Sequence, residues 1–77
     1  MIEVDARGHR CPTPTLRLRR AVEAAPAGAE VALLADDPLA RLDVPHFAHE
    51  QGLELVSVDA EGRALRFVVR KPPGARA

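Results

Sequence analysis

The feature that most constrains this chain is a pair of prolines, Pro12 and Pro14, directly in front of a helical run. Proline is tolerated in the first turn of a helix, because the N–H that it lacks would have no intrahelical partner there. With Cys11 as the N-cap, Pro12 takes the first helical position and Pro14 the third. We therefore predict a helix from about Pro12 to Ala25, whose positive N-terminal end lies at Cys11.

Cys11 is the only cysteine of the 77 residues. A free cysteine has a pKa of about 8.5, and a helix N-terminus favours the thiolate by about 0.3–1 kcal/mol. The positive charges of Arg10 and Arg7, and the free N–H groups expected at Cys11 and Thr13, act in the same direction. Cys11 is thus a candidate nucleophile. The alternative is that it is a small buried hydrophobic residue, as lone cysteines usually are.

Composition limits the class of protein. A chain of 77 residues is one small domain, and a single cysteine leaves no intramolecular disulfide, so any thiol partner must be another molecule. Eleven basic and eleven acidic residues cancel, which argues against nucleic-acid binding. No signal-type stretch or membrane-length apolar run is visible, so we expect a soluble cytoplasmic protein.

The charge is unevenly distributed along the chain. Residues 1–20 contain five arginines and two acidic residues, and this basic stretch includes Cys11. An acidic docking partner would complement it. The alternative is an ordinary solvated helix face.

Apolar periodicity and turn residues predict six elements. They are a strand at 2–7, a helix at 12–25, an interior strand at 29–35, a helix at 43–51, and strands at 53–58 and 63–70 joined by a turn at 59–62. Because Pro45 should break a helix begun at Leu39, residues 39–42 are expected to form a turn or a separate short piece. Phe47 and Ala48 should face the core.

Each predicted helix has one apolar face, which predicts an α/β (α+β) two-layer sandwich. Its βαβαββ order gives a four-stranded mixed sheet with two helices on one face. Residues 1–71 form a single domain, and the tail at 72–77 should be mobile. The core face of the first helix is Pro14, Leu18, Ala21, Val22 and Ala25.

The opposite face of that helix carries Leu16 and Arg20, with Thr13 close by. Leu16 beside the thiol is either a partner contact or an ordinary exposed leucine. We assign Leu16, Arg17 and Arg20 to partner binding, and the basic patch that includes Arg10 to docking on an acidic surface.

Other polar pairs are read as structural. Asp36 and Asp37 precede Pro38, which is typical of a cap or turn. His46 and His49 are three residues apart and could share a metal. No matching cysteine or carboxylate pattern accompanies them, so we expect no metal site.

The stretch Gly8-His9-Arg10-Cys11-Pro12-Thr13-Pro14 resembles the Cys-Pro-x-Pro signature of the TusA/SirA family of small bacterial sulfur carriers. The resemblance covers about residues 2–71, with one departure at His9, where the family usually has leucine. Further landmarks follow in order: Asp5, Gly28-Ala29-Glu30, Asp36-Asp37-Pro38, Asp43-Val44-Pro45-His46-Phe47 and Gly52.

The resemblance implies the same two-layer fold and a sulfur carrier that holds sulfur as a persulfide on Cys11. The donor would be a cysteine desulfurase or a rhodanese-like protein. The acceptor would be a protein serving tRNA thiolation, molybdenum-cofactor assembly or sulfur oxidation. Such a chain is a sulfurtransferase-type carrier rather than a turnover enzyme on its own, with covalent cargo and no cofactor. We expect a monomer that binds neither nucleic acid nor membrane.

Around Cys11 we assign supporting roles to Arg10, Pro12, Thr13 and Pro14. The two prolines fix the helix start, and Arg10 and the free N–H groups stabilise the anion. Two alternatives from other classes remain open. One is a regulatory or binding module in which Cys11 is passive. The other is a redox-sensing thiol that forms a mixed disulfide with a small thiol.

Overall fold

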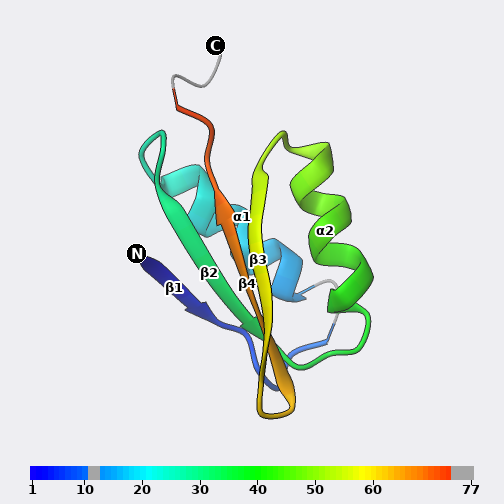
Figure 1. Cartoon of the computed structure of the whole chain (residues 1–77). Coiled ribbons are helices and arrows are strands. Elements are labelled where there is room, and N and C mark those ends of the chain that lie inside the picture. Colours follow the sequence, from blue (N-terminus) through cyan, green and yellow to red (C-terminus); the bar gives the residue numbers. More distant parts are fainter. Residues whose placement is uncertain (11–12, 74–77) are drawn as a thin grey trace.

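The computed structural model describes residues 1–10 and 13–73. Six elements follow one another in the predicted βαβαββ order (Figure 1). They are β1 (Ile2–Asp5), α1 (Thr13–Ala24), β2 (Glu30–Ala35), α2 (Ala40–Glu50), β3 (Glu54–Glu61) and β4 (Ala64–Arg70). The expected tail at 72–77 is described only at Pro72 and Pro73, so its mobility stays a prediction.

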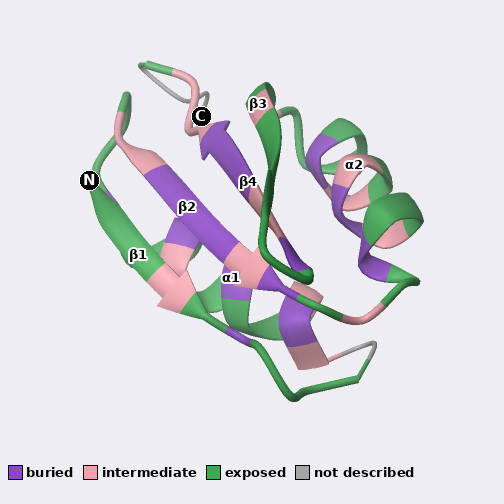
Figure 2. Cartoon of the chain, turned by 60° about the horizontal axis from the view of Figure 1, so that its bottom comes forward, coloured by how far each residue is buried: buried purple, intermediate pink, exposed green. Residues whose placement is uncertain are grey.

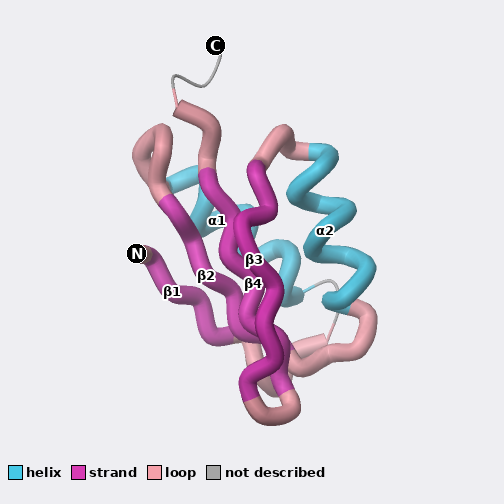
Figure 3. The backbone as a smooth tube through the Cα atoms, viewed as in Figure 1, coloured by secondary structure: helices cyan, strands magenta, loops and turns pink. Residues whose placement is uncertain are grey.

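The sheet has four strands in the order β1-β2-β4-β3. β1 runs parallel to β2, and the other two pairs are antiparallel, so the sheet is mixed as predicted. Both helices cover one face of it, which gives two layers (Figure 3). β2 and β4 are interior and largely buried, whereas the edge strands β1 and β3 are mostly exposed (Figure 2).

The core lies between the helices and the sheet. α1 contributes the predicted face: Pro14, Leu18 and Val22 are buried, Ala25 just beyond the helix is buried too, and Ala21 is half-buried. Opposite them the largest buried side chain is Phe67 of β4. α2 adds Val44 and Ala48, and Phe47 packs against the cluster, as expected.

The other face of the sheet carries ion pairs between neighbouring side chains. Side chains alternate along a strand, so Arg66 and Arg70 point away from the core residues Phe67 and Val69. The Arg66 guanidinium lies 2.8 Å from Glu3, and that of Arg70 lies 2.7 Å from Glu30 and 3.0 Å from Glu54. Each exposed pair contributes little free energy, but together they connect β4 to each of the other three strands.

The prediction for the second helix was wrong at its start. α2 begins at Ala40 and continues through Pro45 as one helix. Asp37 initiates it: its side-chain Oδ1 accepts the N–H of Leu39 at 3.0 Å, and its carbonyl accepts the N–H of Ala40 at 2.9 Å. Proline removes one intrahelical bond. Burial of Val44 and Ala48 offsets that local cost, because tertiary packing supplies most helical stability.

Two strand boundaries also differ from the prediction. β1 ends at Asp5 rather than at residue 7, because the Asp5 carboxylate accepts the backbone N–H of Arg7 at 3.1 Å and bends the chain. β3 continues to Glu61, so the turn is not at 59–62 but is the two residues Gly62 and Arg63. Gly62 has φ 64°, as the first residue of a type II′ hairpin turn requires.

Candidate functional site

Cys11 and Pro12 lie outside the described residues, so the predictions made for them remain predictions. The residues on either side are joined by a hydrogen bond, in which the Thr13 N–H donates to the Arg10 carbonyl at 2.8 Å. The expectation that Thr13 offers a free N–H was therefore wrong. α1 begins at Thr13, and the Pro14 ring is fully buried in the core. The described start of the helix is thus anchored by packing as well as by hydrogen bonding.

The loop between β1 and α1 is tied to the end of β2. The Gly8 N–H donates to Oδ1 of Asp36 at 3.0 Å, and Gly8 has φ 84°, which favours glycine. The Ala6 N–H donates to the Leu34 carbonyl at 2.8 Å, and the His9 N–H to that of Ala6 at 3.2 Å. Asp36 therefore anchors the segment that leads to Arg10.

Sequence reasoning missed this role of Asp36. It assigned both aspartates to a cap or turn, which is correct for Asp37. The available signal was topological. β1 and β2 are adjacent parallel strands, so the residues that follow them, Gly8 and Asp36, emerge at the same edge of the sheet.

Replacing Asp36 with alanine is expected to loosen the β1–α1 loop. Removing one hydrogen bond costs about 0.5–1.5 kcal/mol, so the Gly8 amide should exchange with solvent about two- to tenfold faster. Hydrogen exchange followed by NMR measures this directly. Asp36→Asn is the matched control, because its side-chain oxygen can still accept the bond. Equal Gly8 protection in the alanine variant and the wild type would contradict the anchor.

Asp5 and Arg7 form a salt bridge at the end of β1. Hydrogen bonds donated by the Arg7 side chain, and then by the Arg7 backbone N–H, lower the pKa of Asp5 to about 2 from its usual 3.8. The two Arg7 side-chain bonds are 2.9 and 2.7 Å long. The same pair raises the pKa of Arg7.

This shift predicts an acid-dependent contribution to stability. A depressed carboxyl pKa stabilises the folded chain above about pH 4, and that contribution is lost as the pH falls through about 2. NMR titration of the Asp5 carboxyl carbon should give a midpoint near 2, and Arg7→Gln should move it towards 3.8. An unchanged midpoint in the Arg7→Gln variant would show that a group other than Arg7 lowers the pKa of Asp5.

The predicted partner-binding residues all project from the surface. Leu16 is 52% exposed, and Arg10, Arg17 and Arg20 are exposed. Thr13, which we grouped with the supporting residues, is half-buried. Arg17 is held in place by His9, whose Nε2 lies 3.1 Å from Nη1 of Arg17. His9, the departure from the family pattern, therefore contacts the predicted docking patch.

The described part of the chain contains neither a metal-binding cluster nor a helix that could span a membrane. No group of three or more histidine, cysteine or acidic side chains in residues 1–10 and 13–73 is arranged to hold a metal ion. His46 instead lies 3.9 Å from Glu50, one helical turn away. No helix in those residues has the length and apolar character needed to cross a membrane.

Comparison with known proteins gives the same assignment by sequence and by structure. A family model described as sulfurtransferase TusA matches residues 2–71. A putative sulfur carrier protein of Archaeoglobus fulgidus is 42% identical over 71 residues, which are 91% of this chain and 92% of the relative. The crystal structure of a SirA-like protein from Desulfitobacterium hafniense superimposes with a TM-score of 0.81 at 26% identity, covering 94% of this chain and 99% of that one. The chain therefore belongs to the TusA family.

Proposed function

We propose that this chain carries sulfur as a persulfide on Cys11. The observation that carries the proposal is the chain's only thiol in the segment Cys11-Pro12-Thr13-Pro14, in a member of the TusA family. The printed name of the Archaeoglobus relative, a putative sulfur carrier, supports the same role. A lone thiol suits a carrier, because no second cysteine can capture the cargo.

The chemistry is a displacement at sulfur. The Cys11 thiolate attacks the terminal sulfur of a persulfide on the donor protein. A new S–S bond forms on Cys11 while the donor's own S–S bond breaks, and the donor leaves as a thiolate. The acceptor's thiolate then repeats the step on the Cys11 persulfide. Oxidation states are conserved between the partners, so the transfer itself requires no oxidant, reductant or cofactor.

The described neighbours support this role in two ways. Arg10 supplies positive charge near the thiol in sequence, and the N-terminal end of α1 favours an anion. Thr13 and Pro14 hold the start of that helix, one through its hydrogen bond to Arg10 and the other through burial. Leu16, Arg17 and Arg20 form the patch on which a partner docks.

The donor under this proposal is a cysteine desulfurase or a rhodanese-like protein, and the acceptor is another sulfur-handling protein. The sulfur then enters tRNA thiolation, molybdenum-cofactor assembly or sulfur oxidation. We place this relay in the cytoplasm, where thiols are kept reduced.

Intact-mass spectrometry tests the proposal. The purified chain is incubated with a cysteine desulfurase, its pyridoxal cofactor and cysteine. We expect a gain of about 32 Da per sulfur, reversed by a thiol reductant. A mixed disulfide with the added cysteine, formed in place of added sulfur, would support the redox-sensing alternative. A chain that gains no mass from the desulfurase or from a rhodanese-like donor would contradict the carrier role.

A further inference from the structure

The contact between His9 and Arg17 depends on the charge of the histidine. Nε2 of His9 lies 3.1 Å from Nη1 of Arg17. An arginine guanidinium has N–H donors and no acceptor, so Nε2 of His9 must accept the hydrogen bond. A histidine nitrogen can accept only when the ring is neutral, which here places the ring proton on Nδ1. The contact therefore exists only while His9 is uncharged.

This hydrogen bond joins the chain before Cys11 to the helix after it. His9 belongs to the loop that follows β1, whereas Arg17 lies in α1, about one turn beyond the first residue of that helix. Between them, the Thr13 N–H donates to the Arg10 carbonyl at 2.8 Å. Only the thiol-bearing residue and one proline separate Arg10 from Thr13. The His9 contact thus restrains the segment from both of its ends.

The structures on both sides of this contact are themselves anchored. The His9 N–H donates to the Ala6 carbonyl at 3.2 Å, and the Gly8 N–H donates to Asp36 at 3.0 Å. On the helix side, Pro14 is buried in the core. The His9 ring therefore connects a fixed loop to a fixed helix start, across the segment that carries the thiol.

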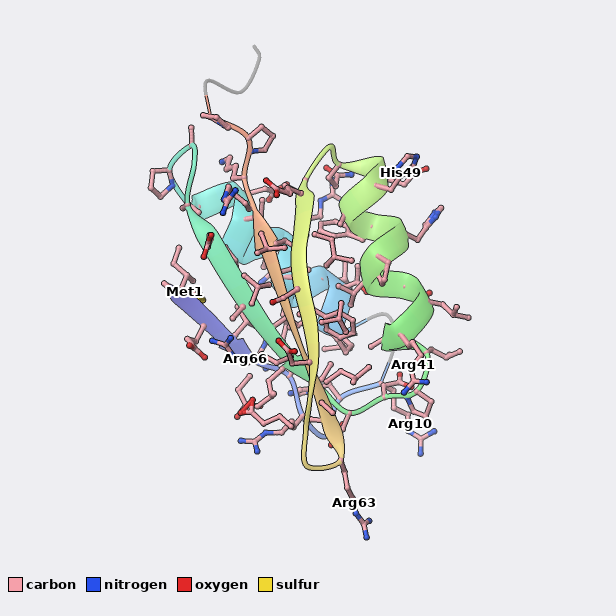
Figure 4. All side chains as sticks on the ribbon, in the orientation of Figure 1. Met1, Arg10, Arg41, His49, Arg63 and Arg66 are labelled. Atoms are coloured by element: carbon pink, nitrogen blue, oxygen red, sulfur yellow. The ribbon has the colours of Figure 1, made fainter. Side chains whose placement is uncertain are left out.

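Other charged groups lie around the contact. They are Arg17 of α1, Asp5, Arg7 and Arg10 on the segment that begins in β1, and Asp36 and Asp37 in the turn after β2. His9 lines a hollow of about 440 Å³ with Arg10 and the two aspartates of that turn, at the end of the molecule where α2 begins (Figure 4). The charge of Arg17 also lowers the pKa of Asp5, after the larger effect of the hydrogen bonds from Arg7.

Protonation of His9 would end the contact with Arg17. The ring would then have two N–H donors and no acceptor, and it would carry a positive charge 3.1 Å from a second one. Attraction would become repulsion, while the carboxylates of Asp36 and Asp37 would draw the charged ring towards the hollow. The two charge states of His9 thus favour two different positions of its side chain.

We propose that neutral His9 is a positioning residue for Cys11: it holds the thiol-bearing segment to α1 by accepting the Arg17 hydrogen bond, and its protonation releases that segment. The inference rests on the proposed function and adds to it a dependence of sulfur loading on the charge of one side chain. Histidine ordinarily changes its charge between about pH 5 and pH 8. Leucine, which the family usually has at this position, could not respond in this way.

Two substitutions separate the acceptor of His9 from its charge. His9→Gln keeps an acceptor oxygen and stays uncharged at every pH, whereas His9→Leu has neither acceptor nor charge. His46→Gln is the matched control, because it removes another exposed histidine, one that lies beside Glu50 on α2. The Thr13 amide is the probe, since its bond to Arg10 spans the thiol-bearing residue. Its exchange with water is measured by NMR at about pH 8 and about pH 5.5.

The wild type should resemble a different variant at each pH. At about pH 8 we expect its Thr13 amide to exchange at the rate of His9→Gln, and that of His9→Leu to exchange about two- to tenfold faster, as for the loss of one hydrogen bond. At about pH 5.5 the wild type should exchange as fast as His9→Leu, while His9→Gln stays protected. Chains are compared at one pH, so the intrinsic pH dependence of exchange cancels. His46→Gln should follow the wild type throughout.

Loading by a cysteine desulfurase with cysteine tests the link to Cys11. The rate of the wild type is divided by that of His9→Gln at the same pH, which removes the pH dependence of the desulfurase. We expect this ratio to be near one at about pH 8 and to fall about two- to threefold at about pH 5.5, because a released segment spends less time in the loading geometry. A purely electrostatic role would raise the ratio instead, since a charged His9 favours the thiolate.

The contradicting outcomes can be told apart. Exchange of His9→Leu at the wild-type rate at about pH 8, or of the wild type at the His9→Gln rate at about pH 5.5, would overturn the inference. Exchange as expected, with a loading ratio that stays near one or rises in acid, would overturn the link to Cys11 and leave the carrier role intact. A wild type that takes no sulfur from the desulfurase or from a rhodanese-like donor would overturn the proposed function, whereas the exchange rates would still show whether His9 holds the segment.

Discussion

Replacing Cys11 with serine is expected to abolish sulfur loading, to below about one hundredth of the wild-type amount. A serine hydroxyl is almost never ionised near neutral pH, so it neither attacks a persulfide nor retains its sulfur. No other thiol in the chain can substitute, because Cys11 is the only cysteine. The measurement is intact mass after incubation with a cysteine desulfurase, its cofactor and cysteine.

The first control for Cys11→Ser is a check that the variant folds as the wild type does. The substitution changes one atom, so circular dichroism and the thermal midpoint should match those of the wild type closely. Ser57→Cys, which places a new thiol on β3, serves as a second control when combined with Cys11→Ser. If a thiol anywhere sufficed, this double variant would regain loading at the wild-type rate. Equal sulfur loading of Cys11→Ser and wild type would refute the assignment of Cys11.

The largest loss of stability is expected from Phe67→Ala. Phe67 is only 1% exposed and is the largest fully buried side chain. Truncating a buried phenylalanine costs about 3–5 kcal/mol, because it removes burial and leaves a cavity. The whole free energy of unfolding of a domain of this size is about 4–12 kcal/mol. The thermal midpoint should therefore fall by at least about 12 °C.

Val56→Ala is the matched control for that experiment. Val56 is exposed and lies at the irregularity in the pairing of β3 with β4, so its truncation should shift the midpoint by no more than a few degrees. Urea unfolding at 25 °C gives an independent measure, since the midpoint should fall without a large change in slope. Similar losses for both variants would mean that Phe67 does not fill the centre of the core.

Local patterns in the sequence were sufficient for much of the fold. The period of the apolar residues in α1 predicted which side faces the sheet, and Pro14, Leu18 and Val22 are buried as expected. The short apolar run around Leu33 predicted an interior strand, and β2 lies between β1 and β4. These predictions succeed because burial imposes a period on the sequence itself.

Features that depend on distant residues could not be predicted in this way. Pro45 was expected to break a helix begun at Leu39, and only the burial of Val44 and Ala48 shows why α2 tolerates it. Lys71 follows the last strand, yet its Nζ donates to the carbonyls of Val22 at 3.1 Å and Ala25 at 2.8 Å and so caps α1.

The candidate site likewise has one part that is local in the sequence and another that depends on distant residues. The thiol and its prolines could be proposed from the sequence as a candidate site, because they lie within four consecutive residues. The Asp36 anchor joins residues 28 positions apart, so it leaves no local trace in the sequence. Topology supplies that missing information, through the shared edge of β1 and β2.

The burial of Pro14 has a mechanical consequence. Helix ends normally fray at little cost, since their terminal residues contact mainly water. In α1 the second residue of the helix is a core residue, so unwinding its first turn would expose apolar surface. The N-terminal end of α1 is therefore stiff, and a partner meets a helix start already in its final shape. Little ordering entropy is then lost on docking, so more of the free energy of the contacts remains available for binding the partner.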